Sequence, residues 1–569
     1  MTNQVAQSQR KASSTDFKLK PLIEYFYEWE KKIPNQVYLR QPYGDTWKEY
    51  TWKEVGDQAR RIVSALKAMN LPEKSNIGLV SKNCAHWIMC DLAIMMSGHV
   101  SVPFYPTLDA EKLGEVLLHS DAEVLFIGKL DNWEGMKEGI PGNIRCITFP
   151  ESPAEQEAYL KWDDLIAQHE PFQGEYLPDL DNLFTIIYTS GTTGMPKGVM
   201  HTFLNYANVL KSSVPLGKFD SPQNRFFSYL PLCHVAERNF VLAGSLYSGG
   251  SVSFVESLDT FAKNLADVQP THFFAVPRIW TKFQLGVLSK MSQKKLDSYL
   301  KIPIFSSLVK KKIQKKLGLA SARVMITAAA PMPASLISWY QKIGLYLLEA
   351  YGMTENAGLC TAMPEGNIKN GTVGQAYPNC DIKIDPKSGE ILMKADWLMT
   401  GYYKEPQKTA ETIKNGWLHT GDMGELDAQG FLKITGRVKD QFKGSKGEFI
   451  VPGPIEAGYA TNNFVEQICI VGRGLPQPVA LVVLSDMGMK LAQNDRIALI
   501  ESLEATRKAV NHTVLSHEKV EKVIITKDAW TIENNMLTPT LKVKRNVLED
   551  VYGERLNTWF EQKESIIWE

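Results

Sequence analysis

The chain has 569 residues, which is enough for a large body and at least one smaller domain. It carries 63 basic and 63 acidic residues, and this balance argues against a nucleic-acid partner. The 7 cysteines are scattered and form no C-x-x-C pair, so we expect reduced thiols and a cytoplasmic protein.

The N-terminal part of the chain alternates between helix and strand patterns. Residues 51–66 carry apolar side chains at helical spacing, with Thr51 as a predicted N-cap and Glu54 three positions on. The short apolar runs 76–80 and 122–127 predict strands. Helices that alternate with strands indicate an α/β fold.

Two early segments bear on targeting. Residues 1–20 are polar and lack the apolar core of a signal peptide, so we expect a flexible leader. Residues 87–96 are more apolar, but they are too short to span a bilayer and include Asp91. We predict a buried helix there.

A glycine-rich loop, Tyr188-Thr-Ser-Gly-Thr-Thr-Gly-Met-Pro-Lys-Gly198, follows a predicted buried strand at 183–187. Its glycines let backbone N–H groups approach phosphate oxygens, and its lysine adds a charge. The spacing is not that of the Walker motif. The alternative is a flexible Gly/Ser/Thr hairpin. The predicted phosphate-binding residues are Thr189, Ser190, Gly191, Thr192, Thr193, Gly194 and Lys197.

A second segment predicts a slot for a flat base. Residues 323–331 form a predicted strand that ends in small residues, and a helix is expected to begin near Pro333. The small side chains of Ala329 and Ala330 leave room beside the backbone.

The sequence Tyr351-Gly-Met-Thr-Glu355 follows another predicted strand. Tyr351, next to Gly352, can stack on the base. Thr354 offers a hydroxyl to an α-phosphate, and Glu355 offers a hard oxygen ligand for Mg²⁺.

A third segment carries Asp422, in His419-Thr-Gly-Asp422, and Arg437. The two oxygens of a carboxylate can accept from the vicinal hydroxyls of a ribose. Arg437 is expected to assist at the ribose and phosphate side. The alternative for an aspartate after glycine is a turn-forming residue.

These motifs, in this order, resemble the nucleotide-binding signature of the adenylate-forming enzymes, which include acyl-CoA synthetases, peptide-synthetase adenylation domains and luciferases. Near the C-terminus, Thr538-Pro-Thr-Leu-Lys-Val-Lys-Arg545 departs from the S-G-K of many members and resembles the form found in long-chain fatty acyl-CoA synthetases. The resemblance covers roughly residues 45–550.

The resemblance implies a large N-terminal domain over residues 21–438, with several subdomains and mixed β-sheets flanked by helices. It implies a small, mobile α+β C-terminal domain over 439–569, with Lys439 at the hinge. Lys542 takes the place of the catalytic lysine, acting with Thr354 and Glu355. The alternative for Lys542 is a basic surface loop.

The resemblance also assigns substrate residues. The loop Gly444, Ser445, Lys446 and Gly447 matches the segment that relatives swing toward the active site for thioester formation. His234 matches a histidine that lines the acyl pocket, and Trp280 matches an aromatic gate; the alternatives are a structural histidine and a core tryptophan.

The implied activity is AMP-forming ligation: a medium- or long-chain fatty acid is activated with ATP and Mg²⁺ and passed to coenzyme A. A carrier protein or another acceptor, and a non-catalytic nucleotide-binding relative, are the alternatives. A homodimer is a further hypothesis. The basic run at 310–316 indicates a solvated helix face or, alternatively, transient contact with a membrane surface.

Overall fold

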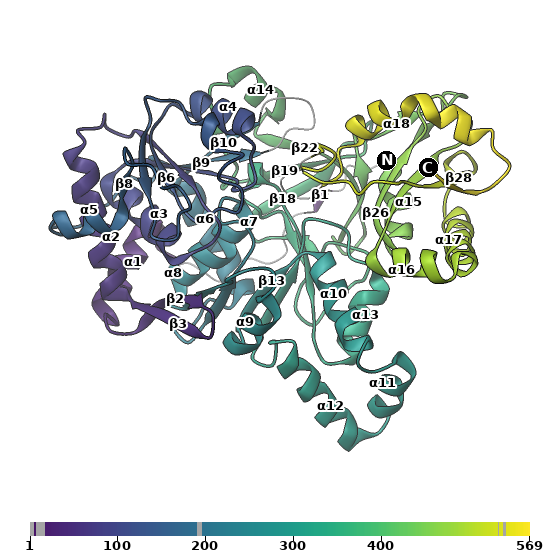
Figure 1. Cartoon of the computed structure of the whole chain (residues 1–569), viewed down its shortest axis with the longest axis horizontal. Coiled ribbons are helices and arrows are strands. Elements are labelled where there is room, and N and C mark those ends of the chain that lie inside the picture. Colours follow the sequence, from purple (N-terminus) through teal and green to yellow (C-terminus); the bar gives the residue numbers. More distant parts are fainter. Residues whose placement is uncertain (1–4, 7–16, 190–195, 533, 539–541) are drawn as a thin grey trace.

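The computed structural model describes residues 5–6, 17–189, 196–532, 534–538 and 542–569. A large body contains three sheets, and a C-terminal domain has a sheet of its own (Figure 1). The predicted α/β fold class with mixed sheets is therefore confirmed. No helix in the described part of the chain has both the length and the apolar character that crossing a membrane requires.

The first large sheet is parallel at its centre and antiparallel at one edge. The strands predicted at 76–80, 122–127 and 183–187 are confirmed within it. In order across the sheet its strands are β20 (Gly401–Tyr402), β10 (Lys197–Thr202), β9 (Leu183–Thr189), β5 (Val100–Phe104), β4 (Asn76–Val80), β6 (Ala122–Ile127), β7 (Arg145–Thr148) and β8 (Leu160–Lys161).

The second large sheet is parallel from its third strand to its eighth. Loops at the carboxyl ends of parallel strands commonly meet a ligand. In order across the sheet its strands are β17 (Gln375–Ala376), β16 (Thr361–Ala362), β15 (Leu348–Tyr351), β14 (Val324–Thr327), β13 (His272–Ala275), β11 (Arg225–Ser228), β12 (Ser251–Phe254), β2 (Val37–Tyr43) and β3 (Thr46–Thr51).

Two consecutive helices pack against each other beside these sheets. The capping box predicted at Thr51 is confirmed at the start of α2 (Trp52–Ala68), where the Thr51 hydroxyl accepts from the Glu54 backbone N–H. The helix predicted at 87–96 is confirmed within α3 (Ala85–Ser97), which is apolar around its circumference and shares one core with strands of both sheets. A helix buried on all sides has this pattern.

The remaining helices of the body cover the sheets and connect their strands. The helix expected near Pro333 is confirmed, with Pro333 as its N-cap. These helices are α1 (Leu22–Lys32), α4 (Ala110–Ser120), α5 (Trp162–Gln168), α6 (Phe203–Gly217), α7 (Val235–Glu237), α8 (Gly244–Ser248), α9 (Phe261–Val268), α10 (Pro277–Leu288), α13 (Ala334–Lys342) and α14 (Pro406–Thr412).

A third, smaller sheet completes the body. Its longest strand pairs with a neighbour so that residue 422 lies opposite residue 437. The strands are β1 (Val5–Ala6), β18 (Cys380–Ile384), β19 (Glu390–Ala395), β22 (Trp417–Leu426) and β21 (Ile413–Lys414), with β23 (Leu432–Arg437) paired to β22.

The C-terminal domain begins with the hairpin β24 (Phe442–Lys443) and β25 (Phe449–Ile450). Its four-stranded sheet has an apolar cluster on each face. The sheet has the order β26 (Val465–Val471), β27 (Val479–Leu484), β28 (Lys522–Ile525) and β29 (Ile566–Trp568). The helices are α15 (Pro452–Tyr459), α16 (Asp486–Asn494), α17 (Arg496–Asn511) and α18 (Arg545–Phe560).

Two helices, α11 (Gln293–Leu300) and α12 (Pro303–Lys316), form an arm that projects from the body in Figure 1. The basic run at 310–316 forms the second half of α12, so the predicted helix is confirmed.

Candidate active site

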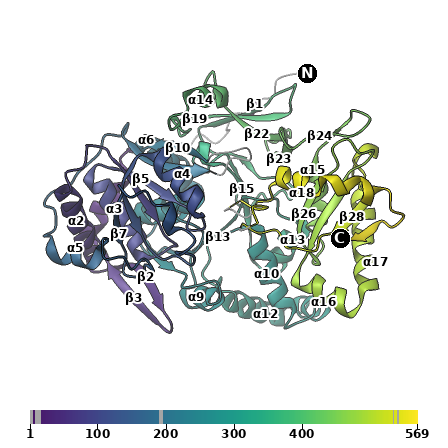
Figure 2. The same cartoon turned by 45° about the horizontal axis from the view of Figure 1, so that its top comes forward.

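A cavity of about 2160 Å³ lies between the body and the C-terminal domain. Its walls include residues of β15, β22 and β23 on the body side and Lys542 on the other. An ion pair between Arg278 of α10 and Glu466 of β26 joins the two sides. Figures 1 and 2 show the C-terminal domain on the side of the body that carries α10. The cavity therefore depends on both parts of the chain.

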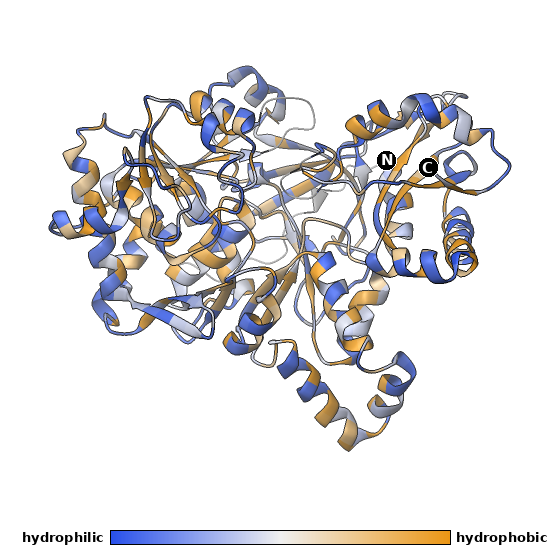
Figure 3. Cartoon of the chain, viewed as in Figure 1, coloured by the Kyte–Doolittle hydropathy of each residue, from blue (hydrophilic) through white to orange (hydrophobic). Residues whose placement is uncertain are grey.

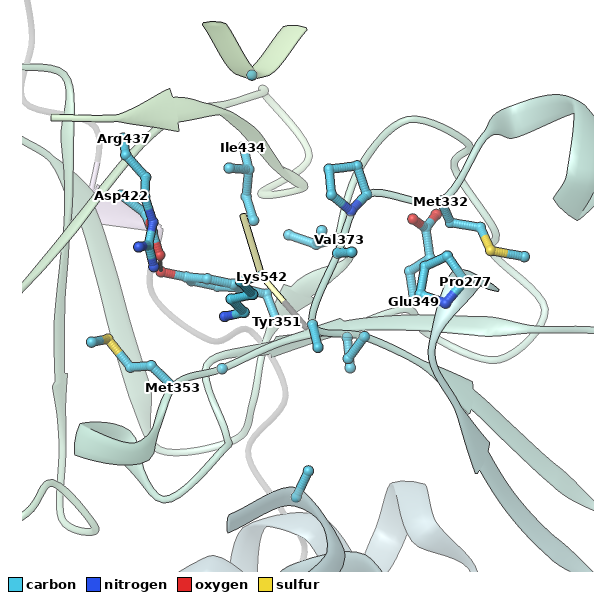
Figure 4. Close-up of a pocket in the computed structure, with 18 of the residues that line it drawn as sticks. Pro277, Met332, Glu349, Tyr351, Met353, Val373, Asp422, Ile434, Arg437 and Lys542 are labelled. Carbon is cyan, nitrogen blue, oxygen red and sulfur yellow. Dashed lines mark hydrogen bonds and ion pairs between the residues drawn. The ribbon is translucent and has the colours of Figure 1, made fainter. Parts of the chain in front are cut away.

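Three predicted residues form one hydrogen-bonded chain in this cleft. The Tyr351 hydroxyl donates to Asp422 Oδ2 at 2.6 Å, and Arg437 Nε donates to Asp422 Oδ1 at 2.9 Å (Figure 4). Pairing of β22 with β23 sets Asp422 opposite Arg437. Burial and the Asp422 carboxylate raise the pKa of Tyr351, so its hydroxyl remains a donor. The aspartate is a positioned acceptor, not a turn residue.

Thr354 and Glu355 are buried in the short 3₁₀ helix that follows β15, and both line the cleft. The Thr354 carbonyl accepts from His201 Nε2 at 2.8 Å. Desolvation lowers the pKa of His201 to about 4, so its ring is neutral at pH 7. Glu355 Oε1 accepts from the Tyr402 hydroxyl at 2.8 Å. Backbone and carboxylate are thus both held in place.

The ends of the predicted phosphate loop are described, and residues 190–194 lie outside the described residues. Lys197 of β10 pairs with Thr189 of β9, and both line the cleft. The ammonium of Lys197 lies 5.0 Å from the centre of the Tyr402 ring. Desolvation and the nearby Lys408 lower the pKa of Lys197.

Backbone geometry opens the predicted base slot. Ala329 and Ala330 line the cleft, and Ala329 has a φ of 73°, a left-handed conformation that is unusual for alanine. Such strain often occurs at functional sites. At Gly352, an added Cβ would lie 2.1 Å from the Gly358 carbonyl oxygen, so only glycine fits there. The structure thus brings the predicted base-binding residues to the same wall.

Lys542 enters the cleft from the C-terminal domain, and its side chain is among the cleft-lining residues drawn in Figure 4. Its backbone N–H donates to Thr538 Oγ1 at 3.0 Å, while its side chain is exposed to the cleft. Desolvation and the Arg437 guanidinium lower its pKa, and Asp422 and Glu355 act in the opposite direction. Lys439, the predicted hinge, also lines the cleft.

The loop Gly444, Ser445, Lys446 and Gly447 connects β24 to β25 and is not among the described residues that line the cleft. The Ser445 backbone N–H donates to the Leu475 carbonyl at 2.9 Å, within the C-terminal domain. In this arrangement Lys542 faces the cleft and the loop does not.

The two predicted substrate residues have different locations. His234 is the N-cap of α7, where its Nδ1 accepts from the Ala236 N–H, and it lines the cleft. Desolvation lowers the pKa of His234 to about 4, so it is neutral at pH 7.

Trp280 requires a correction. It is fully buried, its indole donates to the Ala275 carbonyl at 3.1 Å, and it packs on Tyr340. It does not occur among the described residues that line the cleft, because it faces the core while Arg278 and Thr281 of the same helix face the cavity. Trp280 is therefore a core tryptophan, which was the alternative to an aromatic gate.

Sequence reasoning missed Glu349, which is 6% exposed and lines the cleft close to Met332 and Pro277 (Figure 4). Desolvation raises its pKa to about 8, and no described group hydrogen-bonds its Oε2. The signal was a glutamate inside an apolar strand pattern. The contacts of Tyr402 and His201 were also missed, because they join distant segments.

A Mg²⁺ site can be tested against the side chains. The described residues contain no group of three or more histidine, cysteine, aspartate or glutamate side chains that could hold a metal. Glu355 presents a single carboxylate in the cleft. Mg²⁺ commonly binds one or two carboxylates together with substrate phosphates, so this donor set suits a metal that arrives with a nucleotide.

Comparison with known families identifies the chain. A family model described as "AMP-binding enzyme" matches residues 26–403, and one described as "AMP-binding enzyme C-terminal domain" matches residues 439–564. The chain belongs to the AMP-binding enzyme family. This is the adenylate-forming superfamily that the motifs indicate.

Relatives and solved structures agree with this assignment. The chain is 29% identical to long-chain-fatty-acid–CoA ligase 5 of Mus musculus, covering 92% of this chain and 85% of the relative. It is 29% identical to the peroxisomal long chain acyl-CoA synthetase 6 of Arabidopsis thaliana, covering 94% and 84%. The adenylation domain of a carboxylate reductase from Mycobacterium chelonae has the same fold, with a TM-score of 0.78 at 21% identity over 95% of this chain and 91% of that one.

Proposed function

We propose that this AMP-binding enzyme is an acyl-CoA synthetase that uses ATP and coenzyme A to convert a medium- or long-chain fatty acid into its thioester. The observation that carries the proposal is the convergence of Lys542 with Tyr351, Asp422 and Glu355 in one cleft. The long-chain ligases among its relatives support the choice of substrate.

The first step joins the acid to AMP. A fatty acid carboxylate attacks the α-phosphorus of ATP, a C–O–P linkage forms, and pyrophosphate leaves. No base is needed, because a carboxylate is ionised at neutral pH. This agrees with a neutral His234 that lines the cleft without acting on a proton.

The body would hold the nucleotide. Ala329, Ala330 and Tyr351 would bind the base, and Asp422 with Arg437 would bind the ribose hydroxyls. Residues 189–194 and Lys197 would bind the phosphates. Mg²⁺ bound by Glu355 would neutralise phosphate charge. Lys542 and the Thr354 hydroxyl would stabilise the charge that develops at the α-phosphate.

The acyl chain requires an apolar channel. Part of the cleft has this character, because its wall between α6 and α10 is lined by aromatic and aliphatic side chains. They are Leu216, Phe219, Phe240, Phe274 and Leu285.

The second step forms the thioester. The thiol of coenzyme A attacks the acyl carbonyl, and AMP leaves. Since the loop 444–447 does not line the cleft while Lys542 does, we infer that the C-terminal domain, residues 439–569, rotates about Lys439 between the steps. Such domain motions let one cleft serve two reactions.

The test is pyrophosphate release from ATP and Mg²⁺ with carboxylates from acetate to oleate, with and without coenzyme A. We expect turnover with longer chains, multiple cycles only when coenzyme A is present, and free acyl-CoA as product. Turnover confined to acetate would contradict the proposed preference for medium- or long-chain fatty acids.

Two alternatives have distinct outcomes. An enzyme that passes the acyl group to a carrier protein or another acceptor would show multiple turnover without acyl-CoA as product. A nucleotide-binding relative without catalysis would bind ATP and release no pyrophosphate. A cytoplasmic location and a homodimer stay predictions.

A further inference from the structure

The projecting arm, residues 289–318, is fixed to the body along one side. Leu296 of α11 and Ile313 of α12 are buried, and Val309 packs against the same apolar cluster. This cluster also contains Trp280. The arm is therefore a rigid extension of the α10 region.

The outer end of the arm is apolar and exposed. Ile302, Ile304, Phe305 and Leu308 are 49%, 76%, 53% and 62% exposed. Positions 304, 305 and 308 share one helical face. The Phe305 ring stacks on Tyr299 of α11 at a centroid distance of 6.4 Å. Figure 3 shows hydrophobic residues in orange along α12, beside hydrophilic ones in blue.

Lysines surround this apolar end. Residues 289–318 contain nine lysines and one acidic residue, Asp297, giving a net charge of +8 in a chain whose total is zero. Within the described residues, none of these lysines forms an ion pair. The side chain of Asp297 accepts a 2.9 Å hydrogen bond from Gln293. Lys311, Lys312 and Lys315 are exposed on the face of α12 that carries Leu308.

We propose that the arm docks on an anionic lipid surface, with Ile304, Phe305 and Leu308 inserted at the headgroup boundary. The exposed apolar end of α12 can enter the boundary between headgroups and acyl chains, while the lysines that follow it on the same face contact acidic headgroups. A second copy of the arm would bring +8 against +8, so charge disfavours a dimer through this surface.

The arm also lies at one end of the cleft. Cleft-lining residues follow α10 from Pro277 through Thr281 and Leu285 to Ser289, where the arm begins. A fatty acid dissolved in a bilayer would reach the cleft along this helix. Entry of a fatty acid along α10 rests on the proposed function, whereas binding of the arm to lipid does not.

The test is flotation of the full chain with vesicles of phosphatidylcholine, with or without about one third phosphatidylserine, at low and high salt. We expect binding to the anionic vesicles that weakens with salt. Ile304→Ser/Phe305→Ser/Leu308→Ser and, separately, Lys311→Glu/Lys312→Glu/Lys315→Glu should each weaken it at least about tenfold. Lys519→Glu/Lys527→Glu/Lys563→Glu, at exposed positions of the C-terminal domain, makes the same charge change and should retain most of the binding.

A second measurement reports insertion directly. All seven cysteines are buried, so Phe305→Cys can be labelled selectively with an environment-sensitive dye. We expect a blue shift with anionic vesicles and none with neutral ones. Equal binding of all variants, absence of binding, or a dimer that the apolar variant disrupts would overturn the proposal. Soluble ligase activity, assayed in parallel, tests the proposed function independently.

Discussion

The two sides of the cleft are built in different ways. On the body side, hydrogen bonds of 2.6 and 2.9 Å join Tyr351, Asp422 and Arg437, and the pairing of β22 with β23 sets Asp422 opposite Arg437. On the other side, Lys542 is positioned through its backbone, and no hydrogen bond to its ammonium occurs among the described residues. The difference indicates a preformed nucleotide site and a cation delivered by a separate domain.

Replacement of Lys542 should have the largest effect on the rate, and it should distinguish the two sides of the cleft. Lys542→Ala should lower the rate of adenylate formation by about 10²–10³-fold, because it removes a charge that stabilises the transition state. ATP affinity should change by less than about threefold, because the body contacts remain. Pyrophosphate release and calorimetric titration measure the two quantities.

Lys544→Ala is the matched control for that variant. Lys544 lies on the same segment, donates to Asn535 and does not line the cleft in the described structure. It should keep near-normal activity. Equal loss of ATP affinity and rate in Lys542→Ala would contradict the division between the two sides.

The next effect concerns the preformed side. Asp422→Asn should raise the KM for ATP by about 10–100-fold, because it removes a charged acceptor and the ion-pair partner of Arg437. Tyr351→Phe keeps the aromatic ring and should raise the KM for ATP by about tenfold or less. A double-mutant cycle should show coupling, since the two side chains touch. Strict additivity would argue against one connected site.

A smaller effect is expected at Glu355. Tyr402→Phe removes the donor to Glu355 Oε1 and should lower kcat by about threefold while raising the Mg²⁺ concentration needed for half-maximal rate. Tyr403→Phe is the control, because its hydroxyl donates to Asp121 instead. An unchanged Mg²⁺ dependence in Tyr402→Phe would show that this contact has no role in metal binding.

The smallest effect is on stability. The pKa of Glu349 is raised to about 8, so the folded state binds more protons than the unfolded state between about pH 4.5 and 8. Glu349 therefore lowers the free energy of unfolding by an increasing amount as the pH rises through this window. Glu349→Gln should become more stable relative to the parent chain from pH 6 to pH 8.5, by about 1–3 kcal/mol. Denaturant melts at both pH values check this, and a constant difference would place the carboxyl in water.

Local patterns made several elements predictable. The capping box at Thr51 and the apolar strand at 76–80 depend on neighbours in sequence, and both formed as expected. Contacts between distant segments were not predictable: Asp422 meets Arg437 through sheet register, and Glu349 is buried next to the backbone of Met332.

The predicted role of Trp280 failed for the same reason, because it depended on contacts between distant segments. A tryptophan near the start of an amphipathic helix can face either side, and only packing on Tyr340 and Phe273 decided for the core. The entry of Lys542 into the cleft likewise depends on how two domains sit together, which no local pattern encodes.

The most direct test supplies synthetic acyl-adenylate and coenzyme A to Lys542→Ala and follows thioester formation. We expect this half-reaction to continue within about threefold of the parent rate, while adenylate formation is nearly lost. Equal loss of both half-reactions would contradict a lysine that serves only the first step.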